Sequence, residues 1–417
     1  MFRKYGCTFI VSLFIVLSFA IKLVLIFKYK NLLTLGSDDL NYIKSAAILI
    51  RKGIFTFHNF NEPTVFVTPI YPFFLAAIFK LLGYGLQGLQ AVRIIQALFS
   101  CVTIWVIYLT AKSLFNAHVA LISSFLVSFY IPNITTVGYM MTETLFTTLL
   151  CVLIYLSLKF SRSPSRLNFL ILGFMWGITT LCRPTVALYP LLLFAYMFLH
   201  LKVKFLKSLE LGIVMLAAFC IIMSPWWVRN YIEYGEFIPL AASSGNPMLQ
   251  GTYVNYSPAP SEIVYYKLGK NALETDKTEV KVAKERIGSE FKKDFWGYLR
   301  WFTLGKTYIL WNTIFYWKEF FSIDQKYVLA SHYIFLLGFA GAFVLLFNKF
   351  FKYMLPISVV IYFNAVHCVY MAFDRYAFPL LPLLSIYSGF FIFKLFGILN
   401  ESLPIYAKKS TPHSPDT

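Results

Sequence analysis

Two adjacent carboxylates, Asp38 and Asp39, stand in the stretch "GSDDLNYIKSAAILIRKGIF", directly after a long apolar run. One interpretation is helix capping, since an acid at the start of an apolar-periodic segment complements the helix dipole. The other is catalytic: a carboxylate at a water-filled cleft can act as a general base or orient an acceptor. Adjacent helix residues point in different directions, so only one of the pair can face a given site.

Glu143 is a second acidic candidate, in "GYMMTETLFTTLL" at the expected outer end of an apolar helix. An acid at that depth is costly unless it faces water or a protein-lined cavity. Capping of the helix by Thr142 or Glu143 is the structural alternative.

Three arginines, Arg183, Arg229 and Arg375, stand at expected helix ends in "LCRPT", "SPWWVRNY" and "AFDRYAFPLLP". Arginine binds phosphate through two parallel hydrogen bonds and stays charged. Each could instead be an interfacial residue whose head group reaches water. We expect these arginines on the same outer face of the membrane as the carboxylates. This placement favours a site for a phosphate-bearing ligand beside a hydroxyl acceptor.

Aromatic residues and one histidine complete the candidate substrate-binding set. Tyr42 follows the acid pair and Tyr376 follows Arg375. His367 lies shortly before Arg375, in "NAVHCVYMAFDRY". The default interpretation of His367 is a histidine packed between helices.

Several chemistries lack their motifs. The sequence contains no Walker A loop, GxGxxG, HExxH or GxSxG pattern, and its six cysteines stand singly without a CxxC pair. Nucleotide-driven chemistry, a zinc framework and a disulfide framework are therefore unsupported.

The composition indicates an all-α polytopic membrane protein. Of 417 residues 59% are hydrophobic and only 13% charged, whereas soluble domains carry roughly 25% charge. Long apolar runs recur, which indicates spanning helices rather than a β-barrel. The net charge of +18 lies largely beside these runs, so we expect membrane lipids as its partners and no nucleic acid.

We expect about ten transmembrane helices in a single membrane-embedded domain, residues 1–400, with a disordered cytoplasmic tail over 401–417. Lys and Arg concentrate in alternate short loops, which places both termini in the cytoplasm. The first apolar run is too long for a signal peptide and is expected to stay uncleaved. The expected spans are 7–29, 91–111, 117–132, 143–160, 168–183, 185–200, 209–227, 327–347, 354–371 and 379–398.

Two longer regions then lie outside the cytoplasm, residues 30–90 and 228–326. The first contains an amphipathic segment, 40–52, and a short apolar one, "TPIYPFFLAAIFKLLGYG". Both indicate interfacial or re-entrant helices, because neither is long and apolar enough to span.

The order of several segments resembles the GT-C superfamily of polyprenyl-phosphate-sugar glycosyltransferases. The nearest branch is that of the lipid A aminoarabinose transferases and protein O-mannosyltransferases, which are family-39-like. After the acid pair, the segments that carry the resemblance are "TPIYPFFLAAIFKLLG", "LTAKSLFNAHVALISSFLVSF", "TETLF", "TTLLCRPT", "SPWWVRNY", "GNPMLQGTY" and "DRYAFPLLPLL".

The resemblance implies a lipid-linked sugar donor, a glycan, lipid or protein acceptor, and a site on the extracytoplasmic face, in a bacterial plasma (inner) membrane. The family pattern Asp-acidic-x-x-Tyr-x-x-x-Ala places the catalytic base on Asp38, and the second family acid on Glu143. Some relatives use a divalent metal, which Asp38 and Glu143 could help to hold; the metal stays open. Thr68 replaces a lysine of some members, and the chain lacks the C-terminal domain of longer ones.

Other classes remain as alternatives. A transporter or flippase of lipid-linked sugars would place charges near the bilayer midplane and often show repeats. A polymerase or ligase of lipid-linked sugars, or a sensor protein, would not need the acid pair.

Overall fold

The structure is a computed structural model that describes residues 2–347 and 350–402, and this part is built of helices without strands. The expected tail, 401–417, lies almost wholly outside the described residues. In chain order the helices are α1 (Phe2–Tyr29), α2 (Asp38–Lys52), α3 (Ile70–Leu82), α4 (Leu86–Leu114), α5 (Ala117–Phe129), α6 (Ile131–Thr135), α7 (Glu143–Phe160), α8 (Arg166–Cys182), α9 (Tyr189–Leu199), α10 (Phe205–Tyr234), α11 (Gly245–Gln250), α12 (Ala272–Lys293), α13 (Phe295–Arg300), α14 (Lys306–Asn312), α15 (Gln325–Leu346), α16 (Phe350–Val369), α17 (Asp374–Ala377) and α18 (Leu381–Ser402).

The chain is an integral membrane protein, with fewer full-length spans than expected. Seven helices among the described residues are long and apolar enough to cross a membrane, and there are eight if α5 and the segment that follows it, bent by 59° against each other, form one span. The other two expected spans are helices of 17 and 11 residues, α8 and α9. Two prolines follow α8 in this apolar stretch. Pro184 lies in a short 3-10 turn and Pro190 in the first turn of α9, and α9 is correspondingly short.

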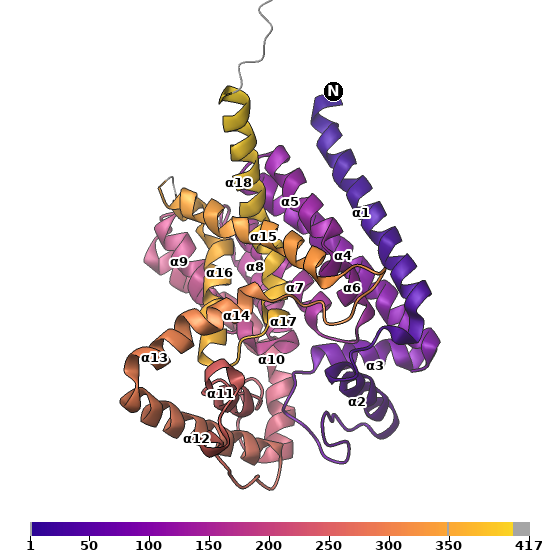
Figure 1. The fold of residues 1–417 in the computed structure, drawn as a ribbon, viewed down its shortest axis with the longest axis vertical. Helices are drawn as coiled ribbons and strands as arrows, with labels where there is room; N and C mark the ends of the chain where they lie inside the picture. Colours follow the sequence, from indigo (N-terminus) through magenta and orange to yellow (C-terminus); the bar gives the residue numbers. More distant parts are fainter. Residues whose placement is uncertain (1, 348–349, 403–417) are drawn as a thin grey trace, which may run out of the picture.

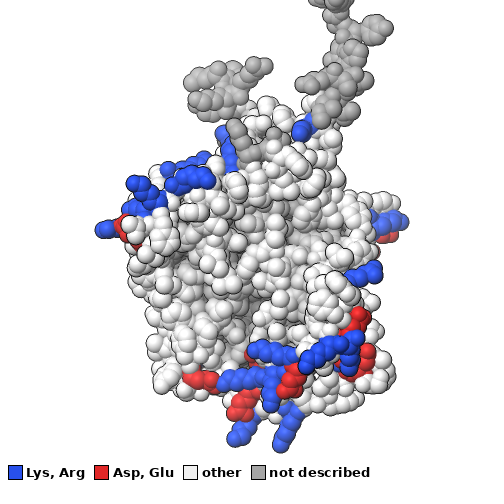
Figure 2. Space-filling view, turned by 90° about the vertical axis from the view of Figure 1, so that its left-hand side faces the viewer, with Lys and Arg blue, Asp and Glu red and all other residues white. Residues whose placement is uncertain are grey.

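The two ends of the molecule differ in content. The chain begins, with α1, at the end where α18 also finishes, whereas α2, α11 and α12 lie at the opposite end (Figure 1). On the face seen in Figure 2, charged residues gather mostly toward these two ends, with a broad band of other residues between them. A band without charges is what a bilayer core requires.

The first loop folds into two short helices that pack together, α2 and α3, and α3 also contacts α4 and α8. Helix α2 buries Tyr42, Ser45 and Ala46, and it ends at Gly53, whose φ of 69° suits glycine. Its Leu40 and Ile50 stay exposed, as expected for a helix whose outer face meets lipid. This arrangement fixes the N-terminus of α2, where Asp38 stands.

Candidate active site

Asp38 is the first residue of α2 and does not act as its cap, since Ser37 occupies the N-cap position. Its carboxylate accepts a hydrogen bond of 2.9 Å from Nη1 of Arg375, on α17. The Asp38 side chain is 36% exposed, so it reaches solvent while paired. A partly exposed carboxylate at a helix start can accept a proton from a ligand.

Arg375 also lies beside a second acid. Its Nε is 3.1 Å from Oε1 of Glu143, the first residue of α7. The same carboxylate accepts a hydrogen bond from Arg183, whose Nε donates to the Thr142 hydroxyl at 2.8 Å. Asp38, Arg375, Glu143 and Arg183 therefore form a continuous ion-pair network, formally neutral, which joins four segments remote in sequence.

Glu143 occupies the interior of this network. Its side chain is fully buried, one oxygen serves both arginines, and Oε2 has no hydrogen-bond partner among the described residues. A buried carboxylate between two guanidiniums compensates their charge and fixes their planes. The geometry therefore gives Glu143 the position of an anchor for the arginines, and leaves Asp38 as the acid that a ligand can approach.

Asp39 points away from the network. It is 1% exposed and accepts hydrogen bonds from the backbone N–H groups of Leu35 and Ser37, each at 2.9 Å. The Thr34 hydroxyl donates to it as well. With its oxygens used in this way, Asp39 shapes the turn that leads into α2, whereas its neighbour Asp38 meets Arg375.

Three further candidates surround the network as packing groups. Tyr42 lies edge-on to Tyr71 with ring centroids 5.1 Å apart, and burial raises the pKa of its phenol while Arg183 opposes the shift. The rings of Tyr376 and His367 are stacked 4.5 Å apart at an angle of 8°. The His367 side chain is buried, so it packs against Tyr376, which follows Arg375 in the chain.

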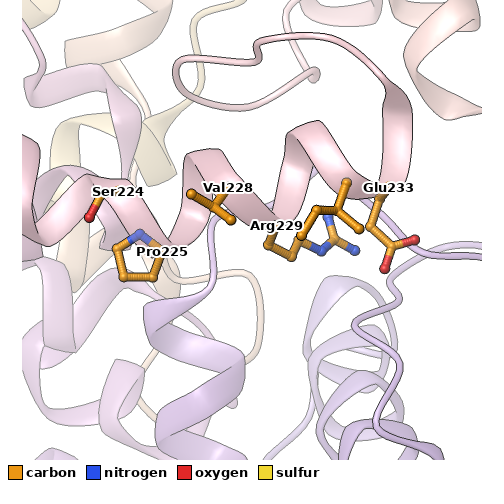
Figure 3. A pocket seen from close by; sticks show the side chains of 6 residues that line it. Ser224, Pro225, Val228, Arg229 and Glu233 are labelled. Atoms are coloured by element: carbon orange, nitrogen blue, oxygen red, sulfur yellow. The ribbon is translucent and has the colours of Figure 1, made fainter.

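Arg229 is not part of the network. From α10 it donates to the Thr64 carbonyl at 2.7 Å and to Asn230 at 3.0 Å, and its guanidinium lies 5.6 Å from the Phe55 ring centre. It thus ties the first loop to α10. Figure 3 shows it beside Val228 and Glu233 in a shallow groove along that helix. The structure brings together two of the three candidate arginines.

We therefore expect Arg229→Ala to loosen the first loop rather than the network. A hydrogen bond from a charged donor is worth about 1.5–3 kcal/mol, so the variant should unfold at lower temperature and be cut faster by protease near residues 55–65. Thermal unfolding and limited proteolysis in detergent would measure both. Unchanged proteolysis in this loop would contradict the assignment.

The sequence predicts a helix-capping role for Thr142, whereas in the structure its hydroxyl accepts a hydrogen bond from Arg183. The signal for such a role is the polar "TET" triplet, which precedes an otherwise apolar helix. Phe146, one turn further along α7, lies with its ring centre 5.6 Å from the Arg183 guanidinium. These two residues hold Arg183 in place from one helix.

The described residues do not bring a set of ligands for a divalent metal together. A metal site needs several oxygen or nitrogen ligands around one point, and the described residues contain no group of three or more His, Cys, Asp or Glu so placed. Asp38 and Glu143 each meet an arginine instead. We derive no step through a metal.

The fold of the chain is similar to that of several solved structures. Over 96% of the chain, the structure matches the apo oligosaccharyltransferase of Archaeoglobus fulgidus with a TM-score of 0.58 at 14% identity, covering 52% of that chain. The chain shares the fold of this oligosaccharyltransferase. The complex of oligosaccharyltransferase AglB, from the same organism, with an inhibitory peptide and dolichol-phosphate matches at 0.56 and 12% identity, covering 98% of this chain and 53% of that one.

The fold expected from the resemblance is thus confirmed. This chain spans about half the length of the archaeal enzyme chains that it matches. ArnT of Cupriavidus metallidurans bound to undecaprenyl phosphate gives a lower TM-score of 0.44 at 15% identity, over 89% of this chain and 77% of that one.

A match at the level of sequence covers a smaller region. Residues 65–228 match the family model of dolichyl-phosphate-mannose-protein mannosyltransferases. No curated protein matches the sequence. The matched region includes Glu143 and Arg183, whereas Asp38 and Arg375 lie outside it.

Proposed function

We propose that this GT-C protein is a membrane glycosyltransferase that moves a sugar from a polyprenyl-phosphate donor to a hydroxyl-bearing glycan, lipid or protein acceptor. The observation that carries the proposal is the pairing of a partly exposed carboxylate, Asp38, with an arginine, Arg375. A base for the acceptor and a cation for the leaving phosphate are the two groups that this transfer needs. The match to mannosyltransferases that use dolichyl-phosphate-mannose supports the donor class.

In the proposed reaction Asp38 takes the proton of the acceptor hydroxyl, whose oxygen attacks C1 of the sugar. The bond between C1 and the phosphate oxygen breaks, and the bonding pair leaves with the polyprenyl phosphate. Arg375, and behind it Arg183, offset the negative charge that develops on the phosphate. In the structure Arg375 is paired with Asp38, so an arriving phosphate would compete for Arg375 and release the carboxylate as a base.

A transporter or flippase is less consistent with this geometry. The ion-pair network joins the first residues of two helices, α2 and α7, rather than residues inside the spans. Charges at the midplane would be expected of a transport pathway.

Two purified-protein measurements would test the function. Polyprenyl-phosphate-mannose, labelled in the sugar, is incubated with the purified protein and a membrane extract that supplies the acceptor. The first measurement is the polyprenyl phosphate that is released, and the second is the label that is incorporated into the acceptor. Release together with incorporation supports a transferase. Movement of intact donor across vesicles without release would identify a flippase, and no reaction with a panel of such donors would contradict the proposal.

The proposed membrane is a bacterial inner membrane, with both termini cytoplasmic and the ion-pair network on the outer side. The orientation is supported by the Lys and Arg residues of the short loops on the side of the termini, and the bacterial membrane is what the family resemblance implies. Reporter fusions should place residues 55 and 270 outside and residues 163 and 204 inside. Residue 55 on the cytoplasmic side would overturn the orientation and the assignment of an extracytoplasmic site.

A further inference from the structure

The short connection between α16 and α17, residues 370–373, is held by the large loop that follows α10. The Tyr256 hydroxyl, from that loop, accepts from the Ala372 N–H at 2.7 Å and donates to the Ala372 carbonyl at 3.2 Å. One side chain therefore satisfies both backbone groups of a residue that stands only three positions before Arg375.

Lys306 holds the same connection from the start of α14. It is fully buried, and its Nζ donates to the carbonyls of Cys368 and Tyr370 at 2.8 and 2.7 Å. The last carbonyls of a helix lack partners within it and carry its negative dipole end, and α16 ends at Val369. An ammonium group suits this position, and the Phe302 ring centre lies 3.7 Å from it.

The loop and the connection also meet backbone to backbone. A Cβ at Gly251 would lie 2.1 Å from the Tyr370 carbonyl oxygen, so only glycine allows this approach. The Trp301 indole donates to the Gly251 carbonyl at 3.0 Å and its ring lies edge-on to Tyr256, with centroids 5.2 Å apart. Tyr256, Lys306, Trp301 and Gly251 are called the loop clasp below.

Next to Arg375 in the chain, the Asp374 carboxylate accepts a hydrogen bond of 2.9 Å from the Trp317 indole. The stretch that leads to Arg375 is therefore held at several points by residues of the segment between α10 and α15. We propose that Tyr256 and Lys306 are positioning residues, which set the place of Arg375 and so couple the large loop to the ion-pair network. The proposal rests on the proposed function and goes beyond it, since neither residue belongs to the network.

The first test compares two identical substitutions in the same loop. Tyr256→Phe removes both bonds to Ala372, whereas Tyr253→Phe removes a bond of 3.1 Å from the Val264 N–H, within the loop itself. A displacement of about 1 Å at a reacting group can cost about 10²-fold in rate. We expect Tyr256→Phe to lower kcat/KM for polyprenyl-phosphate-mannose by about 10–100-fold, and Tyr253→Phe to change it less than about 3-fold at a similar loss of thermal stability.

Lys306 provides a second readout, the pH profile. Burial lowers the pKa of Lys306 to about 7, whereas burial raises that of Tyr256 to about 12. As pH rises through 7 the ammonium loses its charge and one donor, while Tyr256 keeps its proton. The titratable group beside it is the Cys368 thiol, with the Thr307 hydroxyl 3.5 Å from the sulfur. Wild-type kcat/KM should therefore fall above pH 7.

Lys306→Met should lose most of the activity, and its kcat/KM should no longer decrease above pH 7. Lys306→Arg should regain part of the activity at pH 8, since arginine stays charged. A basic limb that persists in Lys306→Met would contradict the assignment of the pH effect to this lysine.

A measurement without substrate separates this proposal from the proposed function. Hydrogen exchange of amides 370–376 should speed up in Tyr256→Phe and stay at the wild-type rate in Tyr253→Phe. Equal exchange and equal kinetics in the two variants would overturn the loop clasp as a positioning device. Faster exchange in Tyr256→Phe in a protein that transfers no sugar would instead keep the clasp and reject the transferase.

Discussion

Asp38→Asn should lower the rate of sugar transfer by about 10²–10⁴-fold, the usual contribution of a general base. The amide keeps the size of the carboxylate, and its oxygen can still accept the bond from Arg375. The N-cap of α2 is Ser37, so this substitution leaves the cap residue in place. The protein should therefore insert and fold, and lose only the ability to take a proton. The turnover of polyprenyl-phosphate-mannose by the purified protein would measure this loss of transfer rate.

Asp39→Asn is the matched control, one position along the chain with the same chemical change. Asp39 accepts from two backbone N–H groups and a hydroxyl in the turn before α2, and the NH₂ of asparagine would meet one of those donors. The substitution should lower the free energy of unfolding by about 1–3 kcal/mol, the penalty for an unsatisfied buried group. It should lower kcat much less than Asp38→Asn does. Full activity in Asp38→Asn, or a larger kcat loss in Asp39→Asn, would show that the base was misassigned.

The sequence predicted the fold well where long apolar runs decide the structure. Each of the ten ranges expected to span falls on a helix, because twenty apolar residues have no other stable arrangement in a bilayer. Helices α8 and α9 coincide with two of the expected spans but are shorter apolar helices, of 17 and 11 residues. An apolar run does not predict the length of its helix where prolines interrupt the run, as Pro184 and Pro190 do.

The site was harder to predict, because its contacts join distant segments. Charge and position placed Asp38, Glu143, Arg183 and Arg375 at one end of the molecule, but which acid meets which arginine depends on how α2, α7, α8 and α17 pack. Arg229 has the same sequence signature, an arginine at a helix end, yet bonds a loop carbonyl. The burial of Glu143, which makes it an anchor, has no local signal either.

The network also explains why a neutral set of charges suits a site for an anionic ligand. Two partly buried arginines without counter-ions would destabilise the fold, and the two acids offset that cost in the absence of ligand. Glu143 stays buried between its partners, so only the outer pair, Asp38 with Arg375, can open toward a ligand. Ligand phosphate would then replace one anion of the network with another.

Arg375→Ala should weaken use of the donor by about 10–150-fold in kcat/KM, which corresponds to a charge-assisted contact of about 1.5–3 kcal/mol. The loss should appear mainly in binding of polyprenyl phosphate, because Arg375 would hold the phosphate of both donor and product. Arg375→Lys should recover only part of it, since lysine cannot make the two parallel bonds by which Arg375 would bind phosphate.

The comparison that decides this prediction is with Arg229→Ala, the same substitution at another helix end in the same protein. Arg229 bonds the Thr64 carbonyl and lies outside the ion-pair network, so its loss should lower thermal stability and leave affinity for polyprenyl phosphate nearly unchanged. Glu143→Gln adds a second check, because both guanidiniums lose their shared counter-ion and should bind phosphate in less defined orientations. If Arg375→Ala and Arg229→Ala bind polyprenyl phosphate equally well, the leaving group is held elsewhere and Arg375 serves only to pair Asp38 with Glu143.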